Sequence, residues 1–566
     1  MTSISTALSL MLFFMCFATQ QVANATDATD ISVQLSQALA THLKYTPDEL
    51  RGVESPIPLK SPIPLIASQD RCLATIYHAT GDKPLWVSDS GPSARAAVAF
   101  GYLQAAETEG LVPADYKTEE IAKLWSSKNI PELALLDTLL TYNLLLYAHD
   151  VSYGQLESYA TNPNILQDTG RQDFDPLITA QTILAATDLS EYLASLPPAH
   201  QHYKALKEAL KTYRTFVADG DWKTIPAGPK LPPGENDPRV PAIRIRLHIT
   251  GDLETIAASD THYDKSLKKA VMQFQRRYGL EADGVIGIKT IAAMNIPAKH
   301  LVGQIIVNMT RWRWQAHDLG EKYVLVNIAG YNLKAVEHDT VVLDLPVIVG
   351  ELENQTPVFS DRIQYLDFNP YWNITRSIAS KEELPHLQQN PRYLVDRKVR
   401  LFSSWDSDAV EMDSTRVNWK AISSAQMARY KLRQDPGPLN ALGRIKFVFP
   451  NRYAIYMHDT PKRDLFSQSK RNFSHGCIRV SDPLALATFV LNGEKANWSI
   501  DKITESIDTG RRKVVQLTSP LSVHLTYQTT WVDKDGTIHF NRDVYGRDTE
   551  LSLALLGENR HMQHRQ

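Results

Sequence analysis

The sequence predicts an α+β protein of several domains, helical in its first half and built on a mostly antiparallel β-sheet in its second half. The chain has 566 residues, and a single hydrophobic core rarely organises more than about 250–300 residues. Apolar residues recur at three-to-four spacing as far as residue 298, a period typical of amphipathic helices. From Lys322 onward they gather in short β-rich runs between turn signals, which is typical of strands.

The N-terminus carries the pattern of an export signal. An apolar run, Leu8–Phe17, leads through polar residues to Ala23-Asn24-Ala25, the small-x-small motif after which signal peptidase cuts. We therefore predict that residues 1–25 are removed on export. The run is shorter than the roughly 20 apolar residues of a membrane-spanning helix. The first basic residue, however, is Lys44, so retention as an anchor stays an alternative.

Composition argues against one class of function and leaves one covalent alternative open. The formal net charge is −3, so the chain lacks the basic excess that binds nucleic acid through its phosphates. Without the signal, two cysteines remain, Cys72 and Cys477. An oxidising compartment favours a disulfide between them, and this alternative competes with a reactive role for either thiol.

Residues 26–235 are predicted to form a helical domain. Stretches such as Leu135–Tyr147 and Tyr203–Val217 place apolar residues at helical spacing, and we find no chemical motif among them. The domain ends at residues 227–234, a segment dense in helix breakers that predicts a linker.

A second, compact helical domain is predicted for residues 238–300. One apolar helical stripe in it consists of Leu267, Ala270, Val271, Phe274 and Tyr278. Asp264 suits the start of this helix and Gly279 its end. The phrases Ala270–Gln275 and Asp283–Gly287 resemble the small three-helix peptidoglycan-binding domain of many wall enzymes. The sequence leaves open whether the binding groove is accessible or the module serves only for packing.

Residues 301–510 are predicted to form a β-rich domain. Strands are expected at Tyr323–Ile328, Tyr331–Val336, Thr340–Val349, Arg444–Phe449 and Tyr453–Met457. Residues 377–437 interrupt them with a polar, partly helical segment that is too long for a plain connection, so we expect a lid or subdomain there. Residues 511–566 return to β-like alternation, and we expect this tail to pack back on the first domain.

One string in the β-rich domain carries the candidate chemistry: His458 and, after a short gap, Ser474-His475-Gly476-Cys477. Acyl transfer by a thiol needs a thiolate, a base and backbone N–H donors for the developing oxyanion. Cys477 is the candidate nucleophile. Gly476 lets the backbone turn beside it and carries no side chain that would block the reacting carbonyl.

Two histidines are candidates for the base that ionises this thiol. A thiol of pKa about 8.5 is only slightly ionised near neutral pH, so a nearby imidazole is needed. His475 is two residues from Cys477, which constrains their approach. His458 comes from another strand, whose end holds it rigidly. We therefore assign His458 as general base and His475 as a neighbour that orients or stabilises. After the loop, Asp482 and Pro483 suit the start of a helix.

This string resembles the signature of the L,D-transpeptidase catalytic domain: a histidine, a spacer, then Ser/Thr-His-Gly-Cys and a hydrophobic residue. The flanking phrases Thr356–Ser360, Phe368–Trp372 and Asn440–Phe447 also resemble the large Gram-negative members of that family. Those members resemble this chain almost end to end, with a helical scaffold, a peptidoglycan-binding domain and a capping insertion. Arg479 departs from the asparagine that many members carry, which affects a local substrate contact and not the nucleophile.

The resemblance implies a periplasmic enzyme that cross-links the third residues of neighbouring peptidoglycan stem peptides through a Cys477 thioester. It also implies that carbapenem-type β-lactams acylate Cys477. The implied partners are stem peptides and glycan, with room for partner proteins of wall synthesis, and no cofactor is implied. Substrate contacts are assigned to Ser474, Arg479, Arg444 and Trp372. For the two arginines a structural ion pair is the alternative, and for Trp372 core packing.

Three alternatives to this function stay open on sequence. His458, His475, Cys477 and Asp459 are all zinc ligands by residue type, although their spacing suits acyl transfer better than a metal site. A cysteine carboxypeptidase or endopeptidase would share the acyl-enzyme and differ only in the acceptor. A wall-binding scaffold with an inert catalytic domain would have no need of the complete nucleophile–base signature.

Overall fold

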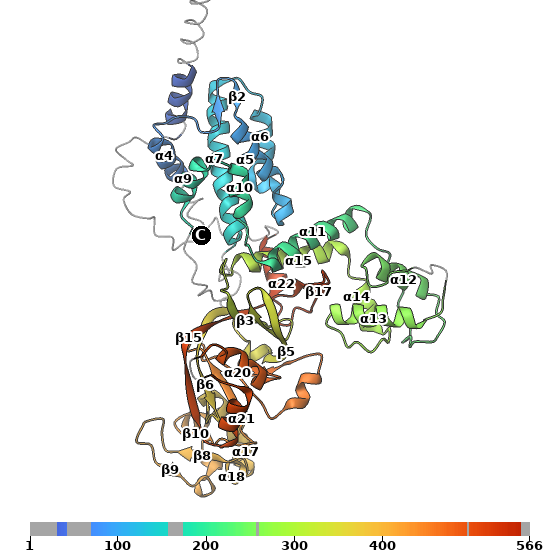
Figure 1. The fold of residues 1–566 in the computed structure, drawn as a ribbon, viewed down its shortest axis with the longest axis vertical. Helices are drawn as coiled ribbons and strands as arrows, with labels where there is room; N and C mark the ends of the chain where they lie inside the picture. Colours follow the sequence, from blue (N-terminus) through green and yellow to red (C-terminus); the bar gives the residue numbers. More distant parts are fainter. Residues whose placement is uncertain are drawn as a thin grey trace, which may run out of the picture.

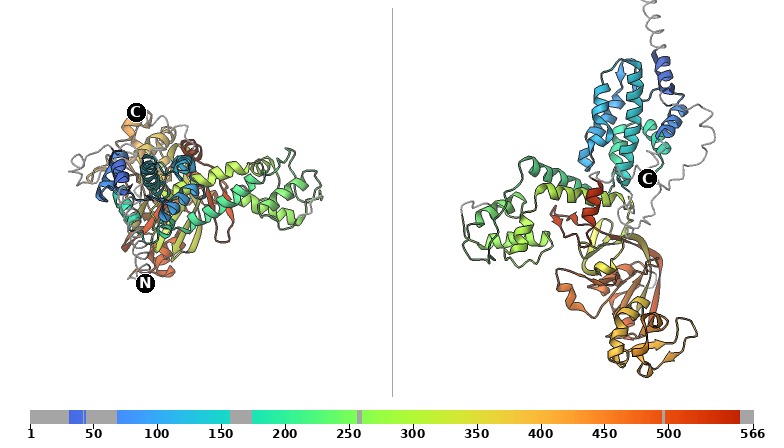
Figure 2. Two further views of the ribbon diagram at one scale, coloured as in Figure 1. Left: turned by 90° about the horizontal axis from the view of Figure 1, so that it is seen from above. Right: turned by 180° about the vertical axis from the view of Figure 1, so that it is seen from behind.

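The computed structural model describes residues 31–41, 43, 69–156, 174–255, 260–494 and 497–555. Figure 1 shows a helical body at one end of the molecule, a β-sheet body beyond it and a small helical module to one side. The views in Figure 2 show the module projecting sideways on a pair of long helices. Over the described ranges, no helix is long and apolar enough to cross a membrane. The predicted export signal and its alternative, an anchor, lie outside the described residues.

The helical body is built around one long helix, α7 (Ile130–Tyr153). Around it lie α4 (Gln69–Ala79), α5 (Ala94–Gln104), α6 (Thr118–Leu124), α9 (Pro176–Ala185), α10 (Leu189–Ser195) and a hairpin of β1 (Val87–Ser88) and β2 (Gly91–Pro92). α7 begins where the Asn129 side chain accepts a hydrogen bond from Glu132 N. The buried Asp137 carboxylate on this helix accepts hydrogen bonds from the backbone of residues 85–87, which fixes the hairpin to the helix.

The sideways module contains α12 (Val240–Ile249), α13 (Lys265–Arg277) and α14 (Ile288–Met294). Asp264 caps α13 by accepting a hydrogen bond from Leu267 N, and the chain leaves the helix through Gly279 at φ +59°. Two long helices, α11 (Gln201–Ala218) and α15 (Ala298–Arg313), pack against each other beside the module. Their buried side chains share one core with those of α12–α14. The domain boundaries that we predicted at residues 235 and 300 therefore divide a continuous core.

The β-rich part is one sheet that closes on itself. In sheet order its strands are β13 (Asn472–Ser474), β5 (Thr340–Gly350), β14 (Ile478–Val480), β12 (Met457–His458), β11 (Ile445–Val448), β6 (Phe359–Phe368), β15 (Lys513–Thr526), β3 (Lys322–Asn327) and β4 (Asn332–Glu337). β4 also pairs with β5. The pairs β12–β14, β13–β5 and β15–β3 are parallel, and the other pairs are antiparallel. This arrangement confirms the predicted α+β class with a mostly antiparallel sheet.

The strand expected at Tyr453–Met457 is shorter than predicted. The Asn451 side chain accepts hydrogen bonds from Tyr453 N and Ile455 N, which holds these residues in a turn. Only Met457 and His458 remain for β12.

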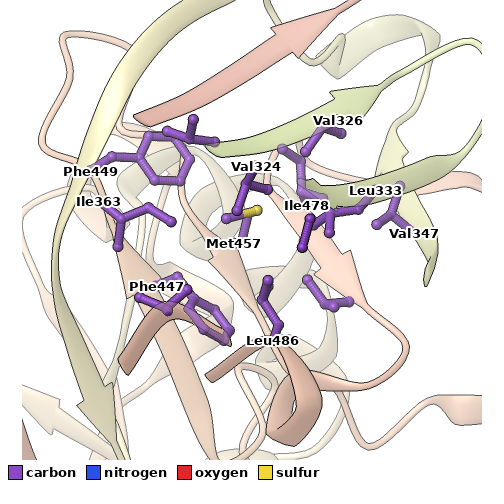
Figure 3. Close-up of a cluster of buried hydrophobic side chains, with 14 of the residues drawn as sticks. Val324, Val326, Leu333, Val347, Ile363, Phe447, Phe449, Met457, Ile478 and Leu486 are labelled. Carbon is purple, nitrogen blue, oxygen red and sulfur yellow. The ribbon is translucent and has the colours of Figure 1, made fainter. Parts of the chain in front are cut away.

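The core of the sheet body lies between the curved sheet and two helices, α20 (Pro483–Leu491) and α21 (Ile500–Asp508). α20 begins at Asp482, whose side chain accepts a hydrogen bond from Ala485 N, as the sequence predicts. Met457 and Ile478, on the adjacent strands β12 and β14, are fully buried in this core near Leu486 of α20 (Figure 3).

β15 corrects the end that we predicted for the β-rich domain at residue 510. This strand lies inside the sheet, antiparallel to β6 and parallel to β3. Its alternation is visible in the sequence, but its parallel partner is distant in the chain, so no local signal identifies the pairing. After it, the hairpin of β16 (Thr530–Val532) and β17 (Ile538–Phe540) contacts α11, α13 and α15, and α22 (Arg547–Leu555) contacts α15.

The insertion is a folded subdomain, which we call the cap. Its four-stranded sheet has the order β7 (Trp372–Ile374), β10 (Lys431–Gln434), β8 (Val399–Phe402) and β9 (Glu411–Met412). Its helical segments are α16 (Arg376–Ile378), a π-helical turn (Ala379–Glu383), α17 (Leu384–Gln389), α18 (Tyr393–Asp396) and α19 (Ser424–Met427). The cap has its own buried core, which includes Leu387, Leu401 and Trp419. It begins at Trp372, earlier than the predicted residue 377, because β7 pairs with β10.

We predict that the cap can be removed without unfolding the sheet body, because its core is separate and its ends are paired. Residues 376–430 would be replaced by an Asn-Gly hairpin turn, and Ile374 and Leu432, which lose their cover, by threonine. The melting transition of the sheet body, followed by circular dichroism, should persist. Loss of that transition would mean that the cap is part of the fold of the sheet body.

Candidate active site

Three adjacent strands bring chemical side chains into one row. In the register of β11, β12 and β14, Lys446 lies opposite His458, and His458 lies opposite Arg479. The neighbouring positions Met457 and Ile478 are buried in the core on one face of the sheet. Because side chains alternate along strands, Lys446, His458 and Arg479 lie together on the other face.

Cys477 is the residue before β14, and its side chain lies on this same face because it alternates with the buried Ile478. Ile478 N donates to Tyr456 O at 3.1 Å, which sets Cys477 beside Tyr456. The half-buried Sγ lies 3.9 Å from Ala454 O. Burial raises the pKa of the Cys477 thiol, against hydrogen bonds from the backbone and side chain of Tyr456 and the positive charges of Lys446 and Arg479, which lower that pKa. Because burial has the largest effect, the resting thiol is neutral at neutral pH.

The loop that carries the candidate nucleophile, residues 474–477, which we call the nucleophile loop, is held by its own polar groups. Ser474 Oγ donates to Cys477 O at 2.5 Å and accepts from Gly476 N at 3.2 Å. Gly476 has φ +105°, and a Cβ there would lie 3.2 Å from Ile455 Cδ1, so glycine suits this position. Ser474 is 2% exposed. Its hydroxyl is used within the loop, which corrects our assignment of Ser474 to substrate contact.

His458 is a buried, neutral imidazole. Its Nδ1 lies 2.5 Å from Asp459 O, and because a carbonyl only accepts hydrogen bonds, Nδ1 carries the proton and Nε2 the lone pair. Burial, together with the positive charges of Arg479 and Lys446, lowers the pKa of His458 to about 3, although the Asp459 and Leu442 carbonyls, which favour the protonated ring, oppose this shift. A neutral imidazole on the same face as Cys477, one diagonal step away, has the protonation state of a base.

His475 points to the cap. Its Nε2 lies 2.5 Å from Oε1 of Glu382, in the π-helical turn of the cap, and both side chains are more than a third exposed. The side chain therefore links the nucleophile loop to the cap.

Two further predicted substrate residues, Arg444 and Trp372, have structural partners of their own. Arg444 forms an ion pair with Asp508 at 3.2 Å, and both side chains are more than half exposed, so the pair contributes at most about 1 kcal/mol. Trp372 lies on β7 and packs partly against the core of the cap.

Sequence reasoning missed Lys446 and Tyr456. Lys446 Nζ lies 3.7 Å from the centre of the Tyr456 ring, and both interact with Cys477. A signal was available, since Lys446 alternates with the apolar Ile445 and Phe447 and so had to face away from the core.

Two alternatives from the sequence, a metal site and a disulfide, depend on where the candidate ligands and thiols lie. Among the described residues, no group of three His, Cys, Asp or Glu side chains is placed to hold a metal ion. Cys72 and Cys477 are both free thiols. Cys72 lies in α4, where burial and the nearby Asp175 raise its pKa to about 11.

Comparison with known proteins divides the chain into three matched regions. Residues 321–501 match the family described as "L,D-transpeptidase catalytic domain", residues 71–210 "Scaffold domain" and residues 236–294 "Putative peptidoglycan binding domain". The chain is 30% identical over 231 residues to the "Putative L,D-transpeptidase" of Haemophilus influenzae. That alignment covers 41% of this chain and 45% of the relative, so the chain spans less than half the length of that protein.

Two solved structures are also similar. A crystal structure of an L,D-transpeptidase from Xylanimonas cellulosilytica is 18% identical, with 53% of this chain and 98% of that chain covered and a TM-score of 0.17. An L,D-transpeptidase from Mycobacterium smegmatis is 13% identical, with 36% and 58% covered and a TM-score of 0.18.

We predict that His458→Ala slows acyl transfer to Cys477 by about 10²-fold or more at neutral pH, the usual effect of a positioned base. The defect should shrink as pH rises, because the thiol, whose pKa is raised, then ionises without help. The measurement is the acylation rate by a small activated ester against pH. His475→Ala should keep the parent's pH profile, and the same profile in His458→Ala would place the base elsewhere.

Proposed function

We propose that this chain, whose residues 321–501 match the L,D-transpeptidase catalytic domain, is an L,D-transpeptidase that forms third-to-third cross-links between peptidoglycan stem peptides through a thioester on Cys477. The observation that carries the proposal is the thiol on a glycine turn, on the same sheet face as two cations and a buried, neutral imidazole that lies one diagonal step away. The match of residues 236–294 to a peptidoglycan-binding family supports the same polymer as substrate.

In the first step, His458 Nε2 accepts the thiol proton and the Cys477 sulfur attacks the carbonyl of the third stem residue. The oxyanion that forms accepts a hydrogen bond from the Cys477 backbone N–H. His458 then gives its proton to the leaving amine of the terminal D-alanine, and a thioester remains. In the second step, the side-chain amine of a neighbouring third residue attacks the thioester and loses a proton to His458. The thiol is then restored.

Lys446 and Arg479 support binding of an anion next to the nucleophile. In the part of the chain that the structure describes, neither forms an ion pair with a carboxylate; the nearby Asp367 is paired with Arg512 at 2.9 Å. Burial lowers the pKa of both groups, a shift that a thiolate at Cys477 opposes. We propose that they bind the free carboxylate of the terminal D-alanine, which arrives with the scissile bond. This keeps Arg479 as a substrate residue and adds Lys446.

We propose that the cap governs access to this site. Its contact with the catalytic loop through Glu382 and His475 supports this role, as does its separate core. The chain without its cap should capture intact stem peptides less well and still react with a small ester.

Transfer and hydrolysis share the thioester, so the products distinguish them. Purified protein incubated with tetrapeptide muropeptides should give third-to-third dimers by mass spectrometry, and Cys477→Ala should give none while still binding isolated wall sacculi. Cys72→Ala should retain full activity because that thiol is buried and distant in the chain. Tripeptides without dimers would indicate a carboxypeptidase, and unchanged muropeptides would indicate an inert scaffold.

Lys446→Met should raise the KM for tetrapeptide donors by about tenfold, the loss of roughly 1.4 kcal/mol expected for one charge-assisted contact. The reason is the missing partner for the D-alanine carboxylate, so a donor amidated at that carboxylate should show little difference between parent and variant. Steady-state kinetics with both donors measures this. An equal loss with both donors would remove Lys446 from carboxylate binding.

A further inference from the structure

A buried threonine, Thr356, donates a hydrogen bond to the nucleophile loop. Thr356 is fully buried, and its Oγ1 donates to Gly476 O at 2.8 Å and accepts from Gly350 N at 2.9 Å. The chain between Gly350 and Thr356 turns tightly, since a Cβ on residue 350 would lie 2.0 Å from Asn354 O. One hydroxyl therefore connects this turn to the peptide that precedes the nucleophile.

The turn is held in place by a tyrosine from the C-terminal segment. Tyr545 is 9% exposed; its hydroxyl donates to Gly350 O at 2.6 Å and accepts from Thr356 N at 3.2 Å. Its ring stacks on Tyr527, with centroids 5.6 Å apart, and the Arg547 guanidinium lies 4.8 Å from its centre. Arg547 also donates to the Gln355 side chain at 2.7 Å. The ring is thus fixed by contacts that do not need its hydroxyl.

These bonds determine which way the Cys477 N–H points. In a trans peptide the C=O and N–H groups point in opposite directions, and the described residues contain no cis peptide. With Gly476 O held on Thr356, the Cys477 N–H is directed to the other side. Within the described ranges this N–H has no hydrogen-bond acceptor, so it is available to an incoming oxyanion. Glycine at position 476 makes rotation of this peptide easy, so the orientation depends on the Thr356 hydrogen bond.

We propose that Thr356 and Tyr545 are positioning residues that hold the Gly476–Cys477 peptide with the Cys477 N–H directed at the developing oxyanion. The inference rests on the proposed function, since it needs an acyl transfer at Cys477. Tyr545, in the C-terminal segment, then influences the reaction through two hydroxyl groups in series, its own and that of Thr356.

Comparing the rates of acylation and of alkylation at the Cys477 sulfur distinguishes orientation of the Cys477 N–H from general support of the loop. Acylation by a carbapenem-type β-lactam forms an oxyanion, whereas alkylation by iodoacetamide displaces iodide and forms none. Tyr545→Phe removes only the hydroxyl and keeps the stacked ring. We expect its acylation rate to fall by about tenfold, less than the 10²–10³-fold cost of deleting a direct oxyanion donor. Its alkylation rate and the pH dependence of alkylation should stay at the parent's values.

Tyr263→Phe is the matched control. Tyr263 is a fully buried tyrosine of the sideways module whose hydroxyl donates to Gly284 O at 2.6 Å, the same kind of bond as that from Tyr545 to Gly350. Its loss should destabilise the protein similarly and leave both rates unchanged. A fall in the acylation rate of this control equal to that of Tyr545→Phe would overturn the proposal.

A second pair of variants keeps the test decisive if Tyr545→Phe does not fold. Thr356→Val should lose acylation selectively, and Thr356→Ser, which keeps the hydroxyl, should restore it. Equal loss of acylation and alkylation in these variants, or no loss of either, would overturn the proposal. If the parent protein forms no lactam adduct but is alkylated at Cys477, the proposed function fails, and this inference fails with it.

Discussion

The candidate site depends on the burial of two side chains, Met457 and Ile478. Both are fully buried between the sheet and α20. Burial of each side chain stabilises the fold by about 1.5–3 kcal/mol, because its apolar surface is removed from water. Because a slip of one residue would turn every side chain of a strand to the other face, this burial fixes the register of β12 against β14. The same register puts His458 beside Arg479 and brings Cys477 to the face that carries Lys446. A two-residue strand is sufficient because its neighbours are longer and its core residue is enclosed.

Burial also sets the charge state of the reacting pair. It raises the pKa of the Cys477 thiol and lowers that of His458 to about 3, so at neutral pH both groups are uncharged. Lys446, Arg479 and Tyr456 favour the thiolate, whereas the same two cations disfavour an imidazolium. On our proposal, the thiolate–imidazolium pair is therefore short-lived. It is consumed when the sulfur forms its bond to the substrate carbonyl carbon. A thiol that is neutral at rest is also less readily oxidised, since oxidation follows thiolate character.

Features set by residues close together in the sequence could be predicted, and features set by contacts between distant segments could not. Local signals were reliable: Asp264 and Asp482 cap the helices that they were expected to begin, and the change of period at Lys322 marks the first sheet strand. The family motif singled out Cys477 and His458 as candidates, but it could not show that the Ser474 hydroxyl is used inside the loop. The position of β15 could not be read at all, because its pairing with β3 joins distant segments. Thr356 was visible only within a family phrase, and its contact with Gly476 O arises from tertiary folding.

The cap is inserted at a point that leaves the register of the sheet intact. It joins β6 to β11, which are antiparallel neighbours with Phe368 opposite Ile445, so the cap replaces what would otherwise be a hairpin turn. Its contact with the nucleophile loop, between Glu382 and His475, is more than a third exposed on both sides, and such a pair is worth at most about 1 kcal/mol. That energy changes a population about fivefold and does not lock a conformation. The loop beneath is held far more firmly, by Ser474 from within and by Thr356 and Tyr545 from below. On our proposal, a Cys477 loop held by its own hydrogen bonds therefore lies under a cap that contacts it through an exposed pair, so a large wall polymer can enter by displacing the cap and leave the oxyanion geometry unchanged.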